Sequence, residues 1–120
     1  MQVLQLAGTE QTPAVVLDKQ NGTFEFSGRS LTDKASDFYS PVISWIKEYA
    51  ESPNPKTDIV FKMEYMNTSS SKAVFDFLSI AQSIKNAKVI WCFQEDDEDM
   101  EETGEEFSSL VKIPFELRAL

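Results

Sequence analysis

The sequence predicts one α/β domain with a mixed, mostly parallel sheet, an opening β-hairpin and about three helices. Two strand-like runs flank an Asn-Gly pair near the start, and helix-like and strand-like segments alternate after them. Strands that alternate with helices are joined by right-handed crossovers into a parallel sheet. The chain has 120 residues, within the usual domain size of about 100–150. We therefore treat residues 1–120 as a single domain.

The opening hairpin is predicted from residues 13–18 and 23–28, which are rich in β-branched and aromatic residues. Asn21-Gly22 lies between them, and this pair favours a type I′ turn because both central positions of that turn need positive φ. Phe24 and Phe26 alternate with polar residues, so one face of the second strand is buried. Residues 3–6 are a candidate edge strand.

The first helix is predicted over residues 40–51, with Ser40 as the N-cap, Pro41 in the first turn and Pro53 beyond the end. Its apolar residues recur at helical spacing. Residues 58–66 then alternate as a strand. The apolar residues expected on one face of that strand are Ile59, Phe61, Met63 and Tyr65.

The second half of the chain continues the alternation. A helix is predicted over residues 70–86, with Asn86 as its stop, and a third over residues 97–109. Residues 88–94 between them are apolar on both faces, which is typical of a central strand covered on both sides. Residues 111–117 predict a last strand, at an edge because of Pro114.

The composition excludes several classes of chemistry. The chain has no histidine and one cysteine, Cys92. This excludes a Ser-His-Asp triad, a His-ligated zinc site, an internal disulfide and a multi-cysteine metal site. None of the four glycines forms a nucleotide-binding motif. We therefore expect no cofactor. No signal peptide or membrane-length apolar run is present, so we expect a cytoplasmic protein.

The net charge of −9 comes from one acidic block. Residues 95–106 hold nine of the 20 acids and no base, while the other 11 acids balance the 11 basic residues. Such a surface repels nucleic acid and anionic membranes and favours a basic protein partner. It could equally be a solvated helix face. Asp97 and Asp99 begin a calcium-loop spacing, but no glycine follows until Gly104, so we predict no metal site.

Four consecutive hydroxyl residues, Thr68 to Ser71, join the end of a predicted strand to the start of a helix. Ligands and modifications of open α/β sheets gather at the carboxyl ends of strands. One hydroxyl or amide is enough to cap a helix, so the others are either simply solvated or form an anion-binding or phosphorylation site. The residues alone leave both readings open.

The sequence resembles the SiaC-type regulatory phosphoproteins, small bacterial proteins similar in fold to the STAS-like anti-sigma factor antagonists. The resemblance runs from Thr12 to about Phe115. The residues that carry it are Thr12-Pro13, Leu17-Asp18, Gly28-Arg29-Ser30, Phe38-Tyr39-Ser40-Pro41, Trp45, Glu64-Tyr65-Met66-Asn67-Thr68-Ser69-Ser70-Ser71-Lys72 and Glu95-Asp96-Asp97-Glu98-Asp99-Met100.

The resemblance implies a non-enzymatic partner-switching protein with a STAS-like fold. A serine/threonine kinase would phosphorylate it on Thr68, and a PP2C-type phosphatase would reverse this. The unphosphorylated form would activate an effector, a diguanylate cyclase in the best-known systems, and so act in c-di-GMP signalling and biofilm regulation. Loop contacts are expected from Asn67, Ser69, Ser70, Ser71 and Lys72. Partner docking is expected from Arg29, Asp96, Asp97 and Asp99.

Two other functions stay open at this point. A small-molecule or nucleotide-binding domain of the same fold would hold an anion at the Thr68 loop, and a small hydrolase would use paired carboxylates. The absence of histidine and of a glycine-rich loop weighs against both.

Overall fold

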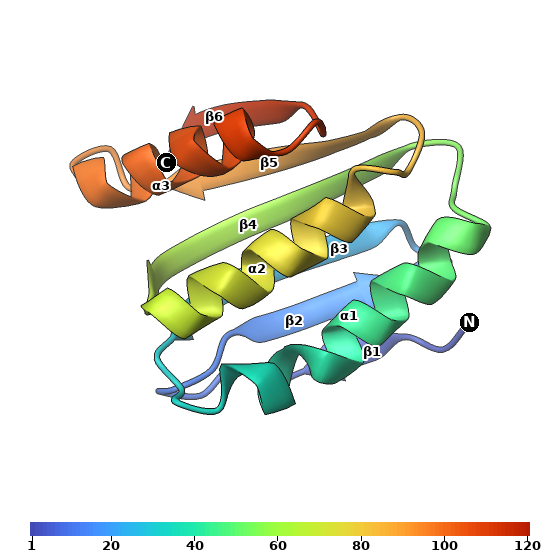
Figure 1. The fold of residues 1–120 in the computed structure, drawn as a ribbon, viewed down its shortest axis with the longest axis horizontal. Helices are drawn as coiled ribbons and strands as arrows, with labels where there is room; N and C mark the ends of the chain where they lie inside the picture. Colours follow the sequence, from blue (N-terminus) through green and yellow to red (C-terminus); the bar gives the residue numbers. More distant parts are fainter.

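A computed structural model describes all residues from 1 to 120 and contains one six-stranded sheet with three helices (Figure 1). The strands are added in chain order; β1, β2 and β3 pair antiparallel, and β3 to β6 pair parallel. This confirms the mixed, mostly parallel sheet. The elements are β1 (Leu4–Leu6), β2 (Ala14–Asp18), β3 (Thr23–Ser30), α1 (Ala35–Glu51), β4 (Thr57–Met66), α2 (Thr68–Ala81), β5 (Ala87–Phe93), α3 (Glu98–Leu110) and β6 (Phe115–Ala119).

All three helices lie on the same face of the sheet (Figure 1). Each crossover joins neighbouring parallel strands, and crossovers of one hand place their helices on one side. Tyr49 of α1 packs on Phe24, and Phe107 of α3 packs on Trp91. None of the helices is long and apolar enough to cross a bilayer.

The predicted strand at residues 88–94 is confirmed as β5, which is paired on both sides, but the prediction that both of its faces are covered by a further layer is wrong. β5 is next to the edge strand β6, and helices cover only one of its faces. On the other face Ile90 and Cys92 are only 8% and 3% exposed. The neighbouring strands place ion pairs there, Lys62–Glu25 and Arg118–Glu116, whose long side chains take the place of a second layer.

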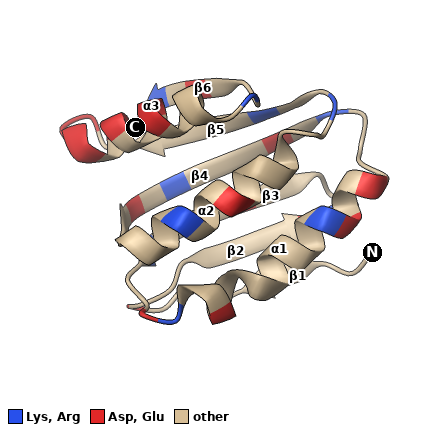
Figure 2. Ribbon diagram, viewed as in Figure 1, with Lys and Arg blue, Asp and Glu red and all other residues tan.

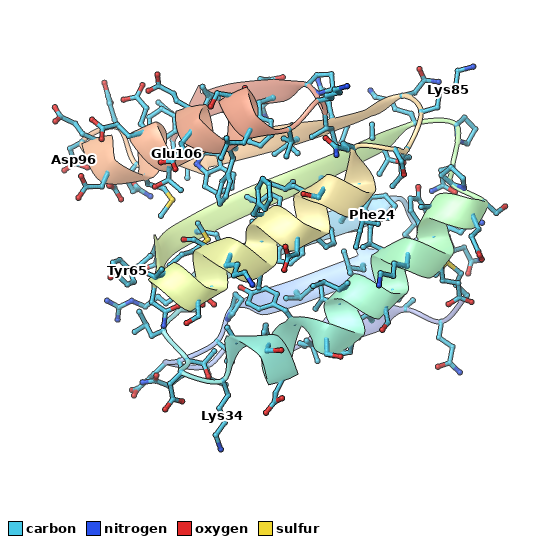
Figure 3. The ribbon with its side chains drawn as sticks, in the orientation of Figure 1. Phe24, Lys34, Tyr65, Lys85, Asp96 and Glu106 are labelled. Atoms are coloured by element: carbon cyan, nitrogen blue, oxygen red, sulfur yellow. The ribbon has the colours of Figure 1, made fainter.

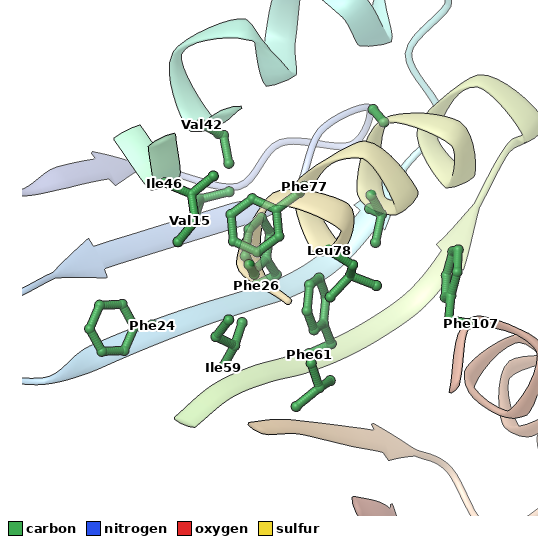
Figure 4. Close-up of a cluster of buried hydrophobic side chains, with 14 of the residues drawn as sticks. Val15, Phe24, Phe26, Val42, Ile46, Ile59, Phe61, Phe77, Leu78 and Phe107 are labelled. Atoms are coloured by element: carbon green, nitrogen blue, oxygen red, sulfur yellow. The ribbon is translucent and has the colours of Figure 1, made fainter. Parts of the chain in front are cut away.

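An aromatic row forms the centre of the core, and Figure 4 shows two of its rings, Phe26 and Phe61, with Phe77 beside them. Phe26, Phe61 and Trp91 come from three adjacent strands, with ring centroids 4.6 and 5.2 Å apart. Phe77 of α2 meets Phe26 edge-on at 5.1 Å. Successive residues of a strand point to opposite faces of the sheet, so the apolar residues that alternate in the sequence share one face. That face is the one the helices cover, and the rings are therefore buried.

The opening hairpin is confirmed, but its turn is not type I′. Asp18 and Thr23 are the last paired residues, so the loop has four residues, and only Gly22 has positive φ, at 68°. The Asp18 carboxylate accepts hydrogen bonds from the Asn21 backbone N–H at 3.1 Å and from its side-chain amide at 2.7 Å. These bonds stabilise Asn21 in a different turn conformation from the one predicted.

The same bonds predict an acid dependence of stability. The hydrogen bond from the Asn21 side chain, then that from its backbone, lowers the pKa of Asp18 below its ordinary value of 3.8. A carboxyl whose pKa is lower in the folded state contributes stability above the unfolded value and loses it as the pH falls through the folded value. Asp18→Ala should thus lower the free energy of unfolding at pH 7, and the difference from the parent should shrink below pH 3.8.

Urea unfolding at pH 7 and at several pH values below 3.8 measures this difference. Asp33→Ala is the matched control, because Asp33 is exposed and accepts no hydrogen bond. A deficit for Asp18→Ala that stays constant across the titration would contradict the prediction.

Several predicted element ends are corrected. The first helix begins at Ala35, not at residue 40, because Ala35 and Tyr39 are buried and extend its apolar face. Pro41 lies inside the helix on its exposed side. Its missing N–H leaves one carbonyl of the preceding turn without a partner, and that carbonyl faces solvent. Ser40 is therefore not the cap.

The second helix spans Thr68–Ala81 instead of residues 70–86, because Asn67 caps its start and a turn follows Ala81. Asn86 has a φ of 60° and belongs to the link to β5. The last strand begins at Phe115, after Pro114, although Val111 and Ile113 are buried. The third helix agrees with the prediction to within one residue.

Candidate functional site

The hydroxyl loop lies where β4 ends and α2 begins, at the carboxyl ends of the parallel strands (Figure 1). Its four hydroxyl residues have different environments. Thr68 and Ser69 are exposed on the first turn of α2, Ser71 is half-buried and Ser70 has no exposed surface. Thr68 and Ser69 are thus the two exposed residues of the four, and only Ser70 is inaccessible.

Asn67 fixes the loop to the rest of the fold. Its side-chain oxygen accepts a hydrogen bond from the Ser70 backbone N–H at 2.9 Å, which caps α2. Its side-chain amide donates to the Thr32 carbonyl at 3.1 Å, and its backbone N–H donates to the Ser30 carbonyl at 3.0 Å. Three bonds, to β3, to α2 and to the link between β3 and α1, leave Thr68 in a defined position.

We expect Asn67→Ala to lower the free energy of unfolding by about 1–2 kcal/mol, because loss of an N-cap costs that much and the bond to Thr32 is lost as well. Asn67→Asp keeps a capping oxygen and should cost less. Denaturant unfolding of the two variants measures both values. Equal stability of Asn67→Ala and the parent would show that the cap does not hold the loop.

Ser70 belongs to a buried chain of hydroxyls that the sequence did not reveal. The Ser30 hydroxyl donates to the Ser70 hydroxyl at 2.6 Å and is bonded to the Tyr39 hydroxyl at 2.9 Å. Burial raises the pKa of Tyr39 above its ordinary value, and the hydrogen bond that it shares with Ser30 opposes this shift. These neutral groups tie β3, α1 and α2 together beneath the loop. Ser70 therefore holds the loop from inside.

A β-bulge beside the loop changes which side chains reach the surface. Gly28 pairs with Met63, but Arg29 pairs with Tyr65, so Glu64 is the extra residue. The bulge shifts the alternation by one position. Tyr65, predicted on the same face as Phe61, is 51% exposed, and Met66 is buried instead. The bulge thus places an exposed aromatic ring next to the exposed Arg29.

The start of the acidic block lies at the same end of the molecule as the loop (Figure 3). Asp97 caps α3, its carboxylate accepting from the Met100 N–H at 3.0 Å, and Asp96 is exposed just before it. A hollow of about 160 Å³ separates this helix start from the loop. Its lining residues are Glu64, Tyr65, Met66, Ser71, Asp97, Asp99, Met100 and Thr103.

Apart from the buried Ser70, the predicted site residues lie at one end of the molecule, at or next to the end of β3 and the starts of α2 and α3. Nowhere do three or more acidic or cysteine side chains gather closely enough to hold a metal ion. Burial raises the pKa of the Cys92 thiol, which keeps it protonated on the far face of the sheet. The arrangement can bind a protein surface or a phosphate.

A groove between α1 and α2 adds residues that sequence reasoning missed. It has a volume of about 370 Å³ and runs from Ser69 and Lys72 along both helices. Ser36, Ser40 and Ser44 line its α1 side. They are spaced four residues apart, which places them on one helical face, but the predicted helix began too late to show this. The remaining lining residues are Tyr39, Ile43, Lys47, Ala73 and Asp76.

The charges differ on the two sides of the loop (Figure 2). The charged residues of α3 are all acidic, whereas the groove between α1 and α2 has both signs, from Lys47, Lys72 and Asp76. Thr68 stands between the two regions. Lys72 is exposed and lies one helical turn after Thr68, at the spacing that lets i and i+4 side chains interact.

Comparison with known proteins gives consistent results. The family described as SiaC family regulatory phosphoprotein matches residues 6–120. A protein of Pseudomonas aeruginosa strain UCBPP-PA14 is 27% identical over 123 residues, which cover 99% of this chain and 98% of that protein.

Two solved structures are similar along their whole length. Apo-SiaC from Pseudomonas aeruginosa superposes with a TM-score of 0.90 at 27% identity, covering 99% of this chain and 100% of its own. SiaC in the crystal structure of the diguanylate cyclase SiaD with its activator SiaC, also from Pseudomonas aeruginosa, gives 0.88 at 27% identity, covering 98% of this chain and 99% of its own.

Proposed function

Because the chain belongs to the SiaC family of regulatory phosphoproteins, we propose that its activity is controlled by phosphorylation of Thr68. The main observation that supports this proposal is that Thr68 is exposed on the first turn of a capped helix. Backbone N–H groups and the positive end of the helix dipole favour a phosphate there. Ser70 is excluded by burial, and Ser71 is half-buried.

A serine/threonine kinase would add the phosphate and a PP2C-type phosphatase would remove it. Both enzymes need an accessible hydroxyl on a segment that they can recognise. The exposed ring of Tyr65, Ser69 and the groove of α1 and α2 surround Thr68 and supply contacts for them. Lys72 is placed to pair with the phosphate in the free protein.

The effector that we propose is a diguanylate cyclase, bound and activated by the unphosphorylated form. This proposal is supported by the crystal structure of the diguanylate cyclase SiaD with its activator SiaC. The SiaC chain of that structure is similar to this chain along its length. It would place the protein in c-di-GMP signalling. The docking surface would combine the Thr68 loop with Arg29, Asp96, Asp97 and Asp99.

The mechanism of switching would be local. A phosphate adds about −1.5 to −2 charges at one point. An effector surface that covers a neutral hydroxyl must then desolvate that charge, which costs several kcal/mol unless a cation pairs with it. Lys72 can offset only one of these charges, and Asp97 and Asp99, which lie on the same side as the loop, supply no further cation. No rearrangement of the fold is needed.

Mass spectrometry of the protein purified from its native host tests the proposal. We expect a phosphate adduct that peptide mapping places on Thr68, that is absent in Thr68→Ala and that persists in Ser69→Ala. A phosphate on Ser69 would contradict the assignment. An unmodified protein carrying a bound metabolite would instead support the small-molecule alternative.

A further inference from the structure

The outer edge of β6 is a strand edge with unpaired backbone groups. β6 is the last strand of the sheet and pairs only with β5. The Val89 N–H donates to the Pro114 carbonyl and the Leu120 N–H donates to the Phe93 carbonyl, both at 2.8 Å. In a parallel ladder alternate residues bond to the neighbouring strand. The backbone N–H and C=O groups of Glu116 and Arg118 therefore point toward β5. Those of Phe115, Leu117 and Ala119 point outward, away from the sheet.

This edge lacks the protection that the opposite edge has. β1 has three residues, and the Trp45 indole N–H donates to the Gln2 carbonyl beside it at 2.8 Å. β6 has five residues, and its charged side chains, Glu116 and Arg118, are paired with each other. Leu117 and Leu120 are 40% and 55% exposed along it. Unpaired, partly apolar edges are the surfaces to which extended segments add as a further strand.

The acidic helix α3 determines which segment fits. Met100, Gly104 and Phe107 face the sheet, and Asp99 and Thr103 line the hollow against β4 and α2. Gly104 lies against both Trp91 of β5 and Leu117 of β6. The opposite flank of the helix, which carries Glu101 and Glu105 four residues apart, is therefore the flank nearer the outer edge of β6. A strand added there would have alternate side chains beneath these two carboxylates.

We infer that the β6 edge binds an extended, basic segment of a protein partner by strand addition. Outward N–H and C=O groups would supply the backbone bonds, and Glu101 and Glu105 would select Lys or Arg at alternate positions. A second copy of this chain fits less well, because an antiparallel β6 pair would bring two acidic α3 helices together on one face of the joined sheet. This site does not include the Thr68 loop, although the end of the edge at Leu120 shares a hollow with Asp97.

Selection of displayed linear nonapeptides on the full chain tests the inference. We expect enriched peptides with Lys or Arg at alternate positions. Their affinity should fall at least tenfold for Ala119→Pro, which removes one outward N–H and no bond to β5, and stay within twofold for Ala119→Ser. Hydrogen exchange should show the amides of Leu117 and Ala119 protected only in the complex.

A second pair of variants separates local from overall charge. Glu101→Gln with Glu105→Gln should weaken the selected peptides at least tenfold, and Glu102→Gln with Glu106→Gln, which changes the net charge equally, should weaken them less than threefold. Thr68→Asp should leave this binding unchanged, so failure of the Thr68 proposal is seen separately.

Three outcomes would overturn the inference: no enriched peptides, enriched peptides without alternating bases, or binding unaffected by Ala119→Pro. A dimer of the chain in sedimentation that Ala119→Pro abolishes would also overturn it, because the occupant would then be a second copy.

Discussion

Thr68→Asp is expected to weaken binding of the effector, the proposed diguanylate cyclase, more than a hundredfold. Thr68 is exposed at the start of α2, so a charge introduced there leaves the fold intact but must be desolvated in the complex. A loss of about 3 kcal/mol corresponds to more than a hundredfold in affinity. Thr68→Ala keeps a small neutral side chain and should bind within about threefold of the parent.

Titration calorimetry with the purified effector measures these affinities. Thr68→Asn is the matched control for Asp, because it has the same shape without the charge and should bind nearly normally. Ser83→Asp adds the same charge at an exposed position beyond the far end of α2 and should have little effect. If Thr68→Asp and the phosphorylated protein bound as tightly as the unmodified chain, the local mechanism would be wrong.

Gly104→Ala is expected to destabilise the protein by about 1–3 kcal/mol, the usual cost of overpacking. A Cβ atom at this position would lie 2.7 Å from the Leu117 side chain and 2.7 Å from the Trp91 indole nitrogen. That nitrogen donates to the Met100 carbonyl at 3.0 Å, so α3 would have to move away from the sheet and lose this bond. The higher helix propensity of alanine, about 1 kcal/mol, offsets only part of the loss.

Thermal unfolding should show a fall of several degrees, since about 1 kcal/mol moves the midpoint of a domain this size by roughly 4–8 °C. Near-ultraviolet circular dichroism should also change, because Trp91 is fully buried in the parent. Glu105→Ala, on the next and exposed position, should be close to neutral. An equally stable Gly104→Ala would show that α3 is held less closely to the sheet than the structure indicates.

The identity of nearly every element followed from the sequence. Alternation at Phe24 and Phe26, helical spacing of Trp45 and Tyr49, and the repeated strand–helix order depend only on local periodicity and on the handedness of crossovers. The loop with Thr68 could be located for the same reason, because it joins a readable strand to a readable helix. Helix and strand ends were less well predicted, since burial of Ala35 and Tyr39, and not a capping signal, decides where α1 begins.

Only the tertiary structure decided which hydroxyls of the loop are exposed and which are buried. Thr68, Ser69, Ser70 and Ser71 are alike as a sequence, but packing of α2 against β3 and α1 buries Ser70 in the bonds to Ser30 and Tyr39 and leaves Thr68 outside. The bulge that exposes Tyr65 depends on a register shift between two strands, which no single strand encodes. The second face of the sheet has no helices for a similar reason, because the strand order places all three helices on the other face. Ion pairs bury Ile90 and Cys92 on this second face, so the sequence of β5 is apolar on both faces, as if helices covered both. Local physics thus fixed which segments are helices and strands, whereas non-local packing decided which side chains a partner can reach.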